Sequence, residues 1–214
     1  MKKLLAGLVF TVGLATSAQS SVMLVDPTDV RNLSNVLFDD GATGSSLLAD
    51  LNRGPADSVS FSSSQTLMSA SSGQARITAM GGLTNLTFMP TTMNTGFTAA
   101  EFNINTFNRA SGQVTLKAFD QFGLALTSTL DVGNGENRFA LQAFDNQVIT
   151  SVMLTGAAGL IQDVRQVRLG LTSFTPGNGT GTIVPGPIAG AGLPALLALG
   201  GLVWARRRKA ASAA

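Results

Sequence analysis

The sequence contains no histidine and no cysteine. Without histidine, nucleophilic sites of the Ser-His-Asp and Cys-His types are excluded, and the commonest imidazole metal ligand and near-neutral acid–base group is missing. Without cysteine, thiol chemistry and the usual zinc sites are excluded, and a folded domain has no disulfides. Such a domain must therefore be held together by its hydrophobic core or by bound ions.

Tyrosine is also absent, and Trp204 is the only tryptophan. Sugar-binding faces commonly use Trp or Tyr, whose rings combine a broad apolar surface with a polar group, so tight stacking recognition of glycans is disfavoured. Most phenylalanines occupy alternating positions and are expected in the core. Phe119, Phe122 and Phe144 adjoin expected turns and are the candidates for exposed rings.

The balance of charge changes when the two ends of the chain are set aside. The whole sequence has 14 lysines and arginines and 12 acidic residues, a formal net charge of +2. Six of those cations lie at positions 2–3 and 206–209, which leaves eight cations against all 12 acids, a net charge of −4 for the part between. Since phosphate binding needs clustered cations and these eight are scattered, we expect no nucleic-acid partner.

The N-terminus has the three parts of a secretory signal peptide. Lys2 and Lys3 precede an apolar run over residues 4–14, and small residues follow. This order predicts a signal peptide over residues 1–18, with cleavage after Ala18 or, alternatively, after Ser20.

The C-terminus has a second three-part pattern. Val184, Pro185, Gly186 and Pro187 form a stiff Pro-x-Pro segment ahead of an apolar stretch over residues 188–204. As a helix, these 17 residues would rise about 25 Å, enough to cross a thin hydrocarbon layer.

A cluster of cations follows this apolar stretch. Arg206, Arg207 and Arg208 are expected to remain cytoplasmic by the positive-inside rule, and Trp204 stands where an interfacial aromatic residue belongs. We therefore predict a transmembrane helix over residues 188–204.

Residues 184–209 resemble the PEP-CTERM sorting signal of exopolysaccharide-producing Gram-negative bacteria. The core of that signal is Pro-Glu-Pro, an apolar helix and an arginine cluster, and here Gly186 occupies the Glu position. The resemblance implies recognition and processing by an exosortase at the inner membrane, and it leaves the exosortase subtype open. Ahead of this signal, residues 173–183 are rich in Gly, Thr and Pro and have no apolar period, which predicts a flexible spacer, and residues 210–214 form a short tail.

The middle of the chain, residues 19–172, alternates apolar and polar residues in short segments separated by Gly, Asn and Asp. The lead-in to residue 57 is expected to be irregular, with one short strand near 36–38 and a loop over 41–46. The other expected strands include residues 59–61, 75–79, 83–88, 102–104, 114–119, 124–130, 139–143, 148–154 and 167–171.

This spacing, with no long amphipathic helix, predicts a single all-β domain in the form of an antiparallel β-sandwich, most simply a jelly roll. Residues 72–77, 149–154 and 163–168 resemble sandwich domains of the discoidin or carbohydrate-module type, which often precede such sorting tails. This second resemblance implies no particular activity.

The acidic residues supply the remaining candidate chemistry. Asp120, Asp131, Glu136 and Asp145 lie in or near expected turns, and two carboxylates at a set separation are enough for glycoside hydrolysis. Turn formation alone also explains aspartate at such positions. Carboxylates of this kind could bind a structural Ca²⁺ through oxygen, for which the sequence assigns no ligands. We expect no other cofactor.

These observations predict an exported, non-enzymatic cell-surface or extracellular-matrix protein, structural or adhesive, associated with exopolysaccharide. Its expected partners are the exosortase and the inner membrane during sorting, and extracellular polysaccharide afterwards. One alternative is a carbohydrate-binding module, which would need exposed phenylalanine or a polar cleft. Another is a carboxylate-based glycoside-active enzyme, which would need two acids facing one pocket.

Overall fold

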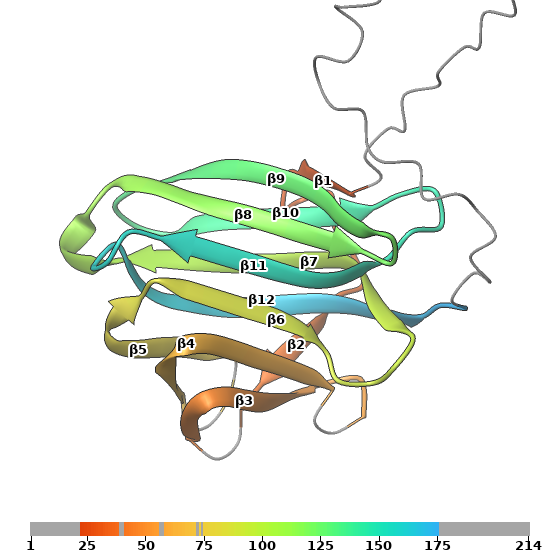
Figure 1. The fold of residues 1–214 in the computed structure, drawn as a ribbon, viewed down its shortest axis with the longest axis horizontal. Coiled ribbons are helices and arrows are strands. Elements are labelled where there is room, and N and C mark those ends of the chain that lie inside the picture. The colour runs from red at the N-terminus through yellow and green to blue at the C-terminus, as the bar shows by residue number, and fades with distance from the viewer. Residues whose placement is uncertain (1–21, 39–40, 56–57, 72, 74, 176–214) are drawn as a thin grey trace, which may run out of the picture. The chain divides into compact units, whose positions relative to one another are not determined.

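The computed structural model describes residues 22–38, 41–55, 58–71, 73 and 75–175, which form an all-β fold (Figure 1). The predicted fold class, all-β and antiparallel, is confirmed. A single 3₁₀ turn, η1 (Phe107–Arg109), interrupts the strands. The strands are β1 (Val22–Val25), β2 (Ser34–Leu37), β3 (Thr43–Leu51), β4 (Val59–Ser69), β5 (Arg76–Leu83), β6 (Asn85–Pro90), β7 (Thr95–Thr106), β8 (Gly112–Asp120), β9 (Gly123–Val132), β10 (Asn137–Ala143), β11 (Ile149–Gly156) and β12 (Ile161–Ser173).

Each segment predicted from residue 59 onward overlaps one of the strands β4 to β12. The expected turns are also present, since β8 ends at Asp120 and β9 begins at Gly123, and β10 begins at Asn137 after the 133–136 turn. The lead-in was predicted correctly only for the short strand near residues 36–38, which overlaps β2, and its expected irregularity elsewhere is wrong. It contains three strands, and the expected loop over 41–46 is largely the start of β3.

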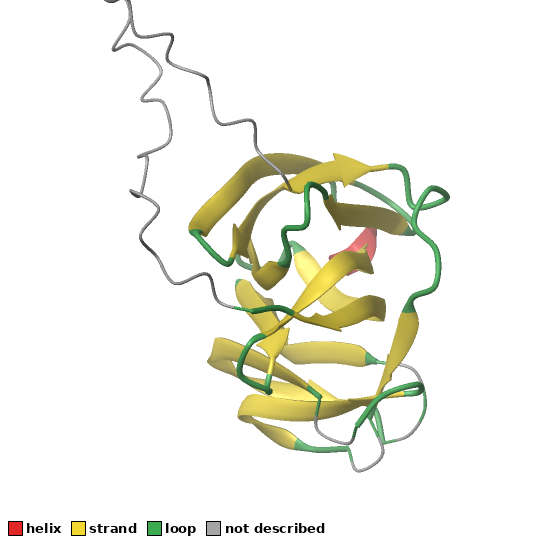
Figure 2. Cartoon of the chain, turned by 90° about the vertical axis from the view of Figure 1, so that its right-hand side faces the viewer, coloured by secondary structure: helices red, strands yellow, loops and turns green. Residues whose placement is uncertain are grey.

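The predicted β-sandwich, including its jelly-roll or discoidin-like form, is wrong. Seven antiparallel strands close a ring in the order β7–β12–β2–β3–β4–β6–β11, and β11 pairs back to β7. β5 bridges β12 and β4, while β10 and β1 extend the sheet from β7, and β8 and β9 extend it from β11. Figure 2 shows the curled strands from the side. A sandwich has two separate sheets, whereas here one hydrogen-bonded sheet curls into a closed barrel.

Local irregularities explain the closure. The register of β12 against β7 shifts at three places, between residues 161 and 163, 165 and 168, and 169 and 171. Such bulges bend a strand and increase its twist. At the point where β11 meets β7, a Cβ on Gly96 would lie 2.7 Å from Cβ of Val148 and 3.0 Å from the Ile149 carbonyl oxygen. Glycine at position 96 therefore permits the close approach of the two strands.

A row of phenylalanine rings fills the core. Phe88 packs against Phe61, Phe97 and Phe102 with ring centroids 5.7, 6.3 and 6.0 Å apart, and the row continues to Phe38. All five rings are fully buried, as the alternating pattern predicted. β6 and β7 both pair with β11 and not with each other, so the contact between Phe88 and Phe102 joins two strands that share no hydrogen bonds. Tilted and edge-on aromatic pairs of this kind add to the stabilisation from burial.

Candidate functional site

The residues of the predicted sorting signal lie outside the described residues, as does Ala18 at the predicted signal-peptide cleavage site. The same holds for the predicted transmembrane helix over residues 188–204. The residues of the predicted sorting signal are Val184, Pro185, Gly186, Pro187, Arg206, Arg207 and Arg208. Over the part of the chain from 22 to 175 that the structure describes, no helix has the length and hydropathy needed to cross a membrane.

The four candidate acids do not gather at one end of the fold. Asp120 lies opposite Gly123 at the start of β9, whereas Asp131 lies near the other end of that strand, beside Gln113. Asp131 lies eight residues after Gly123, which at about 3.3 Å per residue corresponds to roughly 26 Å. Glu136 belongs to the turn at the Asp131 end, and Asp145 precedes β11 near Asp120.

The carboxylates near these turns already have structural hydrogen bonds. Oδ1 of Asp120 accepts the Phe122 amide at 2.7 Å, and Oδ1 of Asp131 accepts from Nε2 of Gln113 at 3.1 Å. Among the described residues, no three metal-ligating side chains are gathered at one place. The structure therefore assigns no ligands there to the Ca²⁺ that the sequence left open.

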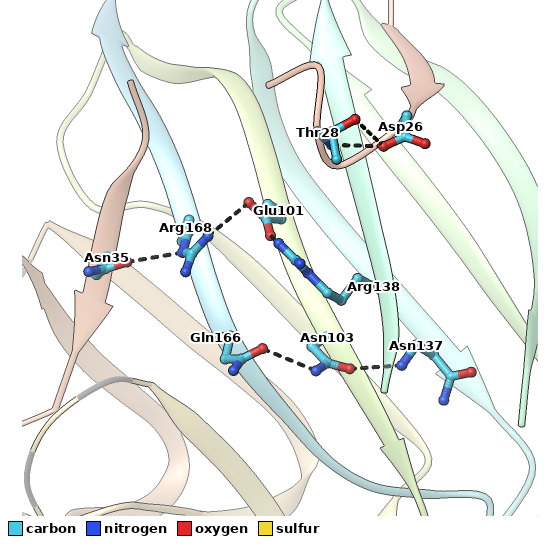
Figure 3. Close-up of polar contacts among 9 residues, drawn as sticks. All are labelled: Asp26, Thr28, Asn35, Glu101, Asn103, Asn137, Arg138, Gln166 and Arg168. Carbon is cyan, nitrogen blue, oxygen red and sulfur yellow. Dashed lines mark hydrogen bonds and ion pairs between the residues drawn. The ribbon is translucent and has the colours of Figure 1, made fainter. Parts of the chain in front are cut away.

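A line of polar side chains, here called the polar ladder, crosses the outer face of β2, β12, β7 and β10 (Figure 3). Glu101 on β7 lies between two arginines and accepts a hydrogen bond from Arg138 on β10. Its other oxygen lies 3.5 Å from Nη1 of Arg168 on β12, whose Nε donates to Asn35 Oδ1 on β2 at 3.2 Å. The hydrogen bond and negative charge of Glu101 raise the pKa of Arg138 above its ordinary value.

A second rung of the polar ladder is formed by amides. Oδ1 of Asn103 accepts the backbone N–H of Asn137 at 2.9 Å, and its Nδ2 donates to Oε1 of Gln166 at 3.1 Å. Gln166 has a positive φ of 54° at the bulge of β12. A third rung joins Asn105 to Gln162 at 3.1 Å.

The centre of the polar ladder is buried, whereas its two arginines are partly exposed. Glu101 is 5% exposed and Asn103 only 1%. Val25 is paired to Ala140 beside Glu101, and Ser34 is paired to Leu169, so the 26–33 connection crosses the outer face of β7 between them. The hydrogen bonds and ion pairs of the polar ladder therefore tie four strands together, and its role is structural.

A second polar region is open. A hollow of about 380 Å³ lies where the β8–β9 turn, the β10–β11 connection and the end of β12 meet, and we call it the loop hollow. It is lined by Thr98, Gln121, residues 146–148 and residues 172–175, none of which carries a charge. Oε1 of Gln121 accepts the Val148 amide at 2.9 Å and so fixes the first turn to the connection.

Exposed aromatic rings lie on the same two loops. Phe122, which follows Gln121, is 74% exposed, and Phe144, in the connection before β11, is 38% exposed. The prediction of exposed rings is confirmed for these two, while Phe119 is half-buried. The sequence analysis missed the amides of Gln121 and Asn146 because such residues are ordinary in turns, and only the pairing of β8 with β11 brings them together.

No protein-family model, no curated protein and no solved structure matches this chain.

Proposed function

We propose that this chain is an exported, non-enzymatic protein of the cell surface or extracellular matrix, sorted by an exosortase and associated with exopolysaccharide. The observation that carries the proposal is the order of parts at the two ends: a signal peptide over residues 1–18 and, at the other end, a Val-Pro-Gly-Pro segment, an apolar span and an arginine cluster. A sorting signal of this kind makes an inner-membrane intermediate, which is then processed near Pro185 to Pro187.

The folded body is suited to such a role. It needs no disulfides, because its strands close around a continuous row of buried phenylalanines. It carries a net negative charge, which makes adhesion to nucleic acid a poor explanation for its export. Its supply of hydroxyl and amide side chains is compatible with a hydrated polysaccharide layer.

The intact mass of the protein recovered from the producing cells tests this proposal. We expect a mass lacking residues 1–18 and the segment beyond the Val-Pro-Gly-Pro motif, because both signals are removed during sorting. Replacing Arg206, Arg207 and Arg208 with glutamine should impair that processing, because the cluster of cations that keeps this end of the apolar span cytoplasmic would be lost. Unchanged maturation of this variant, or an intact chain in the cytosol, would contradict the proposal.

A second candidate function, a carbohydrate-binding module, is favoured by the exposure of Phe122 and Phe144 on two loops that also line an uncharged hollow. Its first test is retention of the processed protein on polysaccharide from the producing organism. Absence of retention over a broad glycan panel would count against it. The alternative of a carboxylate-based enzyme has less support, because the candidate acids are divided between opposite ends of β9.

A further inference from the structure

The loop hollow offers both hydrogen-bond donors and acceptors to a ligand. Amide side chains supply both kinds of group, and hydroxyls do the same, which suits a partner covered in hydroxyl groups. In the described part of the chain, Nε2 of Gln121 has no hydrogen-bond partner, although its Oε1 is used by Val148. Asn146 is exposed in the lining, which also includes the hydroxyl-bearing residues Thr172 and Ser173 of β12. The volume of the hollow falls within the usual range for small-ligand sites, roughly 300–1,000 Å³.

The walls of the loop hollow are fixed before any ligand binds. Besides the bond from Val148 to Gln121, Oγ1 of Thr150 donates to the Asp120 carbonyl at 2.9 Å. The end of β12 is held by the Phe174 amide, which donates to the Asn94 carbonyl at 2.8 Å. Since these bonds position the polar groups in advance, little ordering cost remains for binding.

Two aromatic rings accompany the polar groups. Phe122 directly follows Gln121, and Phe144 is held in a tight turn in which the Gln147 amide donates to the Phe144 carbonyl at 3.0 Å. Asp145 and Asn146 form the centre of this turn with φ of 55° and 60°. A phenyl ring can pack against the apolar face of a sugar ring. Such packing would remove from water the apolar surface that each phenylalanine now exposes.

The charges nearby select among glycans. The lining contains no lysine or arginine, and the charged residues that flank it in sequence are Asp120 and Asp145, both acidic. A uronate-rich chain would meet like charges with no cation to offset them, which costs free energy on binding. A neutral chain meets no such repulsion.

We propose that the loop hollow is a binding site for a neutral polysaccharide, with Gln121 and Asn146 hydrogen-bonding the sugar hydroxyls and Phe122 packing on a sugar face. This inference rests on the proposed function, in which the protein reaches a polysaccharide layer, and it names the class of glycan that the protein holds there.

Affinity electrophoresis of the purified full chain tests the site. The chain is kept in lauryldimethylamine oxide, a detergent without a sugar headgroup, and is run in gels containing dextran, galactomannan, mixed-linkage β-glucan or alginate. We expect at least one neutral glycan to retard the protein and alginate, which is anionic, to leave it unretarded. Retardation by alginate alone, or by none of the four, would overturn the proposal.

Three variants and one control locate the binding. Phe122→Ala removes the ring, Asn146→Gly removes an amide while tolerating the positive φ, and Gln121→Glu keeps the acceptor for Val148 but replaces the donor. Each should weaken binding of the neutral glycan about 10-fold, which corresponds to the loss of one good contact. The control Met80→Ala removes an exposed side chain outside the lining and should change nothing. Equal melting temperatures by circular dichroism establish that the variants are folded.

Binding that persists in all three variants would overturn the assignment of the site. Because the electrophoresis uses the purified chain, its outcome does not depend on export or processing. The intact mass of the cellular protein tests sorting separately, so a failed glycan site and a failed sorting proposal can be told apart.

Discussion

The two faces of β7 are both buried, yet they are built from opposite kinds of residue. Phe102 and Ile104 point into the phenylalanine core, while Glu101 and Asn103, on the alternate positions, point outward into the polar ladder. The inner face depends on the removal of apolar surface from water, which has no strict geometry. The outer face depends on hydrogen bonds and ion pairs, which stabilise only when each group has its partner. The difference shows that, on β7, polar side chains are buried where neighbouring strands supply their partners.

The largest effect is expected from breaking the inner face. Phe88→Ala should lower the free energy of unfolding by roughly 3–5 kcal/mol, because it removes a fully buried ring that contacts three others and leaves a cavity. Urea unfolding followed by far-ultraviolet circular dichroism measures this loss. The matched control is Met89→Ala, since Met89 is the next residue of β6 and is 41% exposed. Equal losses for the two variants would contradict the assignment of the core.

A smaller effect is expected from breaking the outer face at its charged centre. Glu101→Gln keeps the shape of the side chain but leaves Arg138 and Arg168 without their carboxylate. The loss of stability should be roughly 2 kcal/mol, below that of a fully buried pair, because the two arginines remain 46% and 39% exposed. Urea unfolding provides the measurement, and a loss within the noise would show that the ion pairs contribute little.

The amide rung should contribute less than the charged centre. Asn103→Ala removes an acceptor for the Asn137 amide and a donor to Gln166, at a cost of about 1–2 kcal/mol for the buried groups left unpaired. In the native protein this bond protects the Asn137 amide hydrogen from exchange with solvent. Hydrogen exchange at that amide should therefore be faster in the variant. An unchanged exchange rate would mean that another acceptor replaces Asn103.

The smallest effect is expected at the exposed start of the connection over the polar ladder. The side chain and amide of Thr28 donate to Asp26, and these bonds lower the pKa of Asp26 below its ordinary 3.8. A lowered pKa in the folded state adds stability above pH 3.8 and loses it as the pH falls below that value. The urea midpoint of the native chain should therefore drop more steeply on acidification than that of Asp26→Asn. Parallel curves would show that Asp26 contributes no such term.

The sequence predicted the strands that alternate cleanly and the turns between them. β8, β9 and β10 follow this rule, because each of their turns is marked by Gly, Asn or Asp. The prediction from the sequence failed for β3. Gly44, Ser45 and Ser46 at its start resemble loop residues, and only the later half of the strand is buried. Propensity was overridden there by pairing with β4.

Closure of the sheet could not be predicted from alternation, which is the same in a sandwich and a barrel. It depends on pairs between distant segments, such as Arg168 with Asn35, and on bulges in β12. The polar ladder was missed for a related reason. Glu101 and Asn103 occupy positions that normally face solvent, and they are buried among side chains that distant strands bring beside them, such as Arg168 and Gln166 on β12. On the loops that line the loop hollow, the sequence predicted the exposed rings of Phe122 and Phe144 but not the amides of Gln121 and Asn146.

The placement of β12 has a consequence for biogenesis. This last strand of the body is bonded to β2, β5 and β7, which come from the beginning and middle of the chain. The chain is synthesised from its N-terminus. The barrel therefore cannot close until β12 has been made, when almost the whole folded body has been synthesised. We propose that this protein is threaded through a narrow translocation channel. Because β12 is made last, the barrel would stay open and the chain would remain able to pass through the channel.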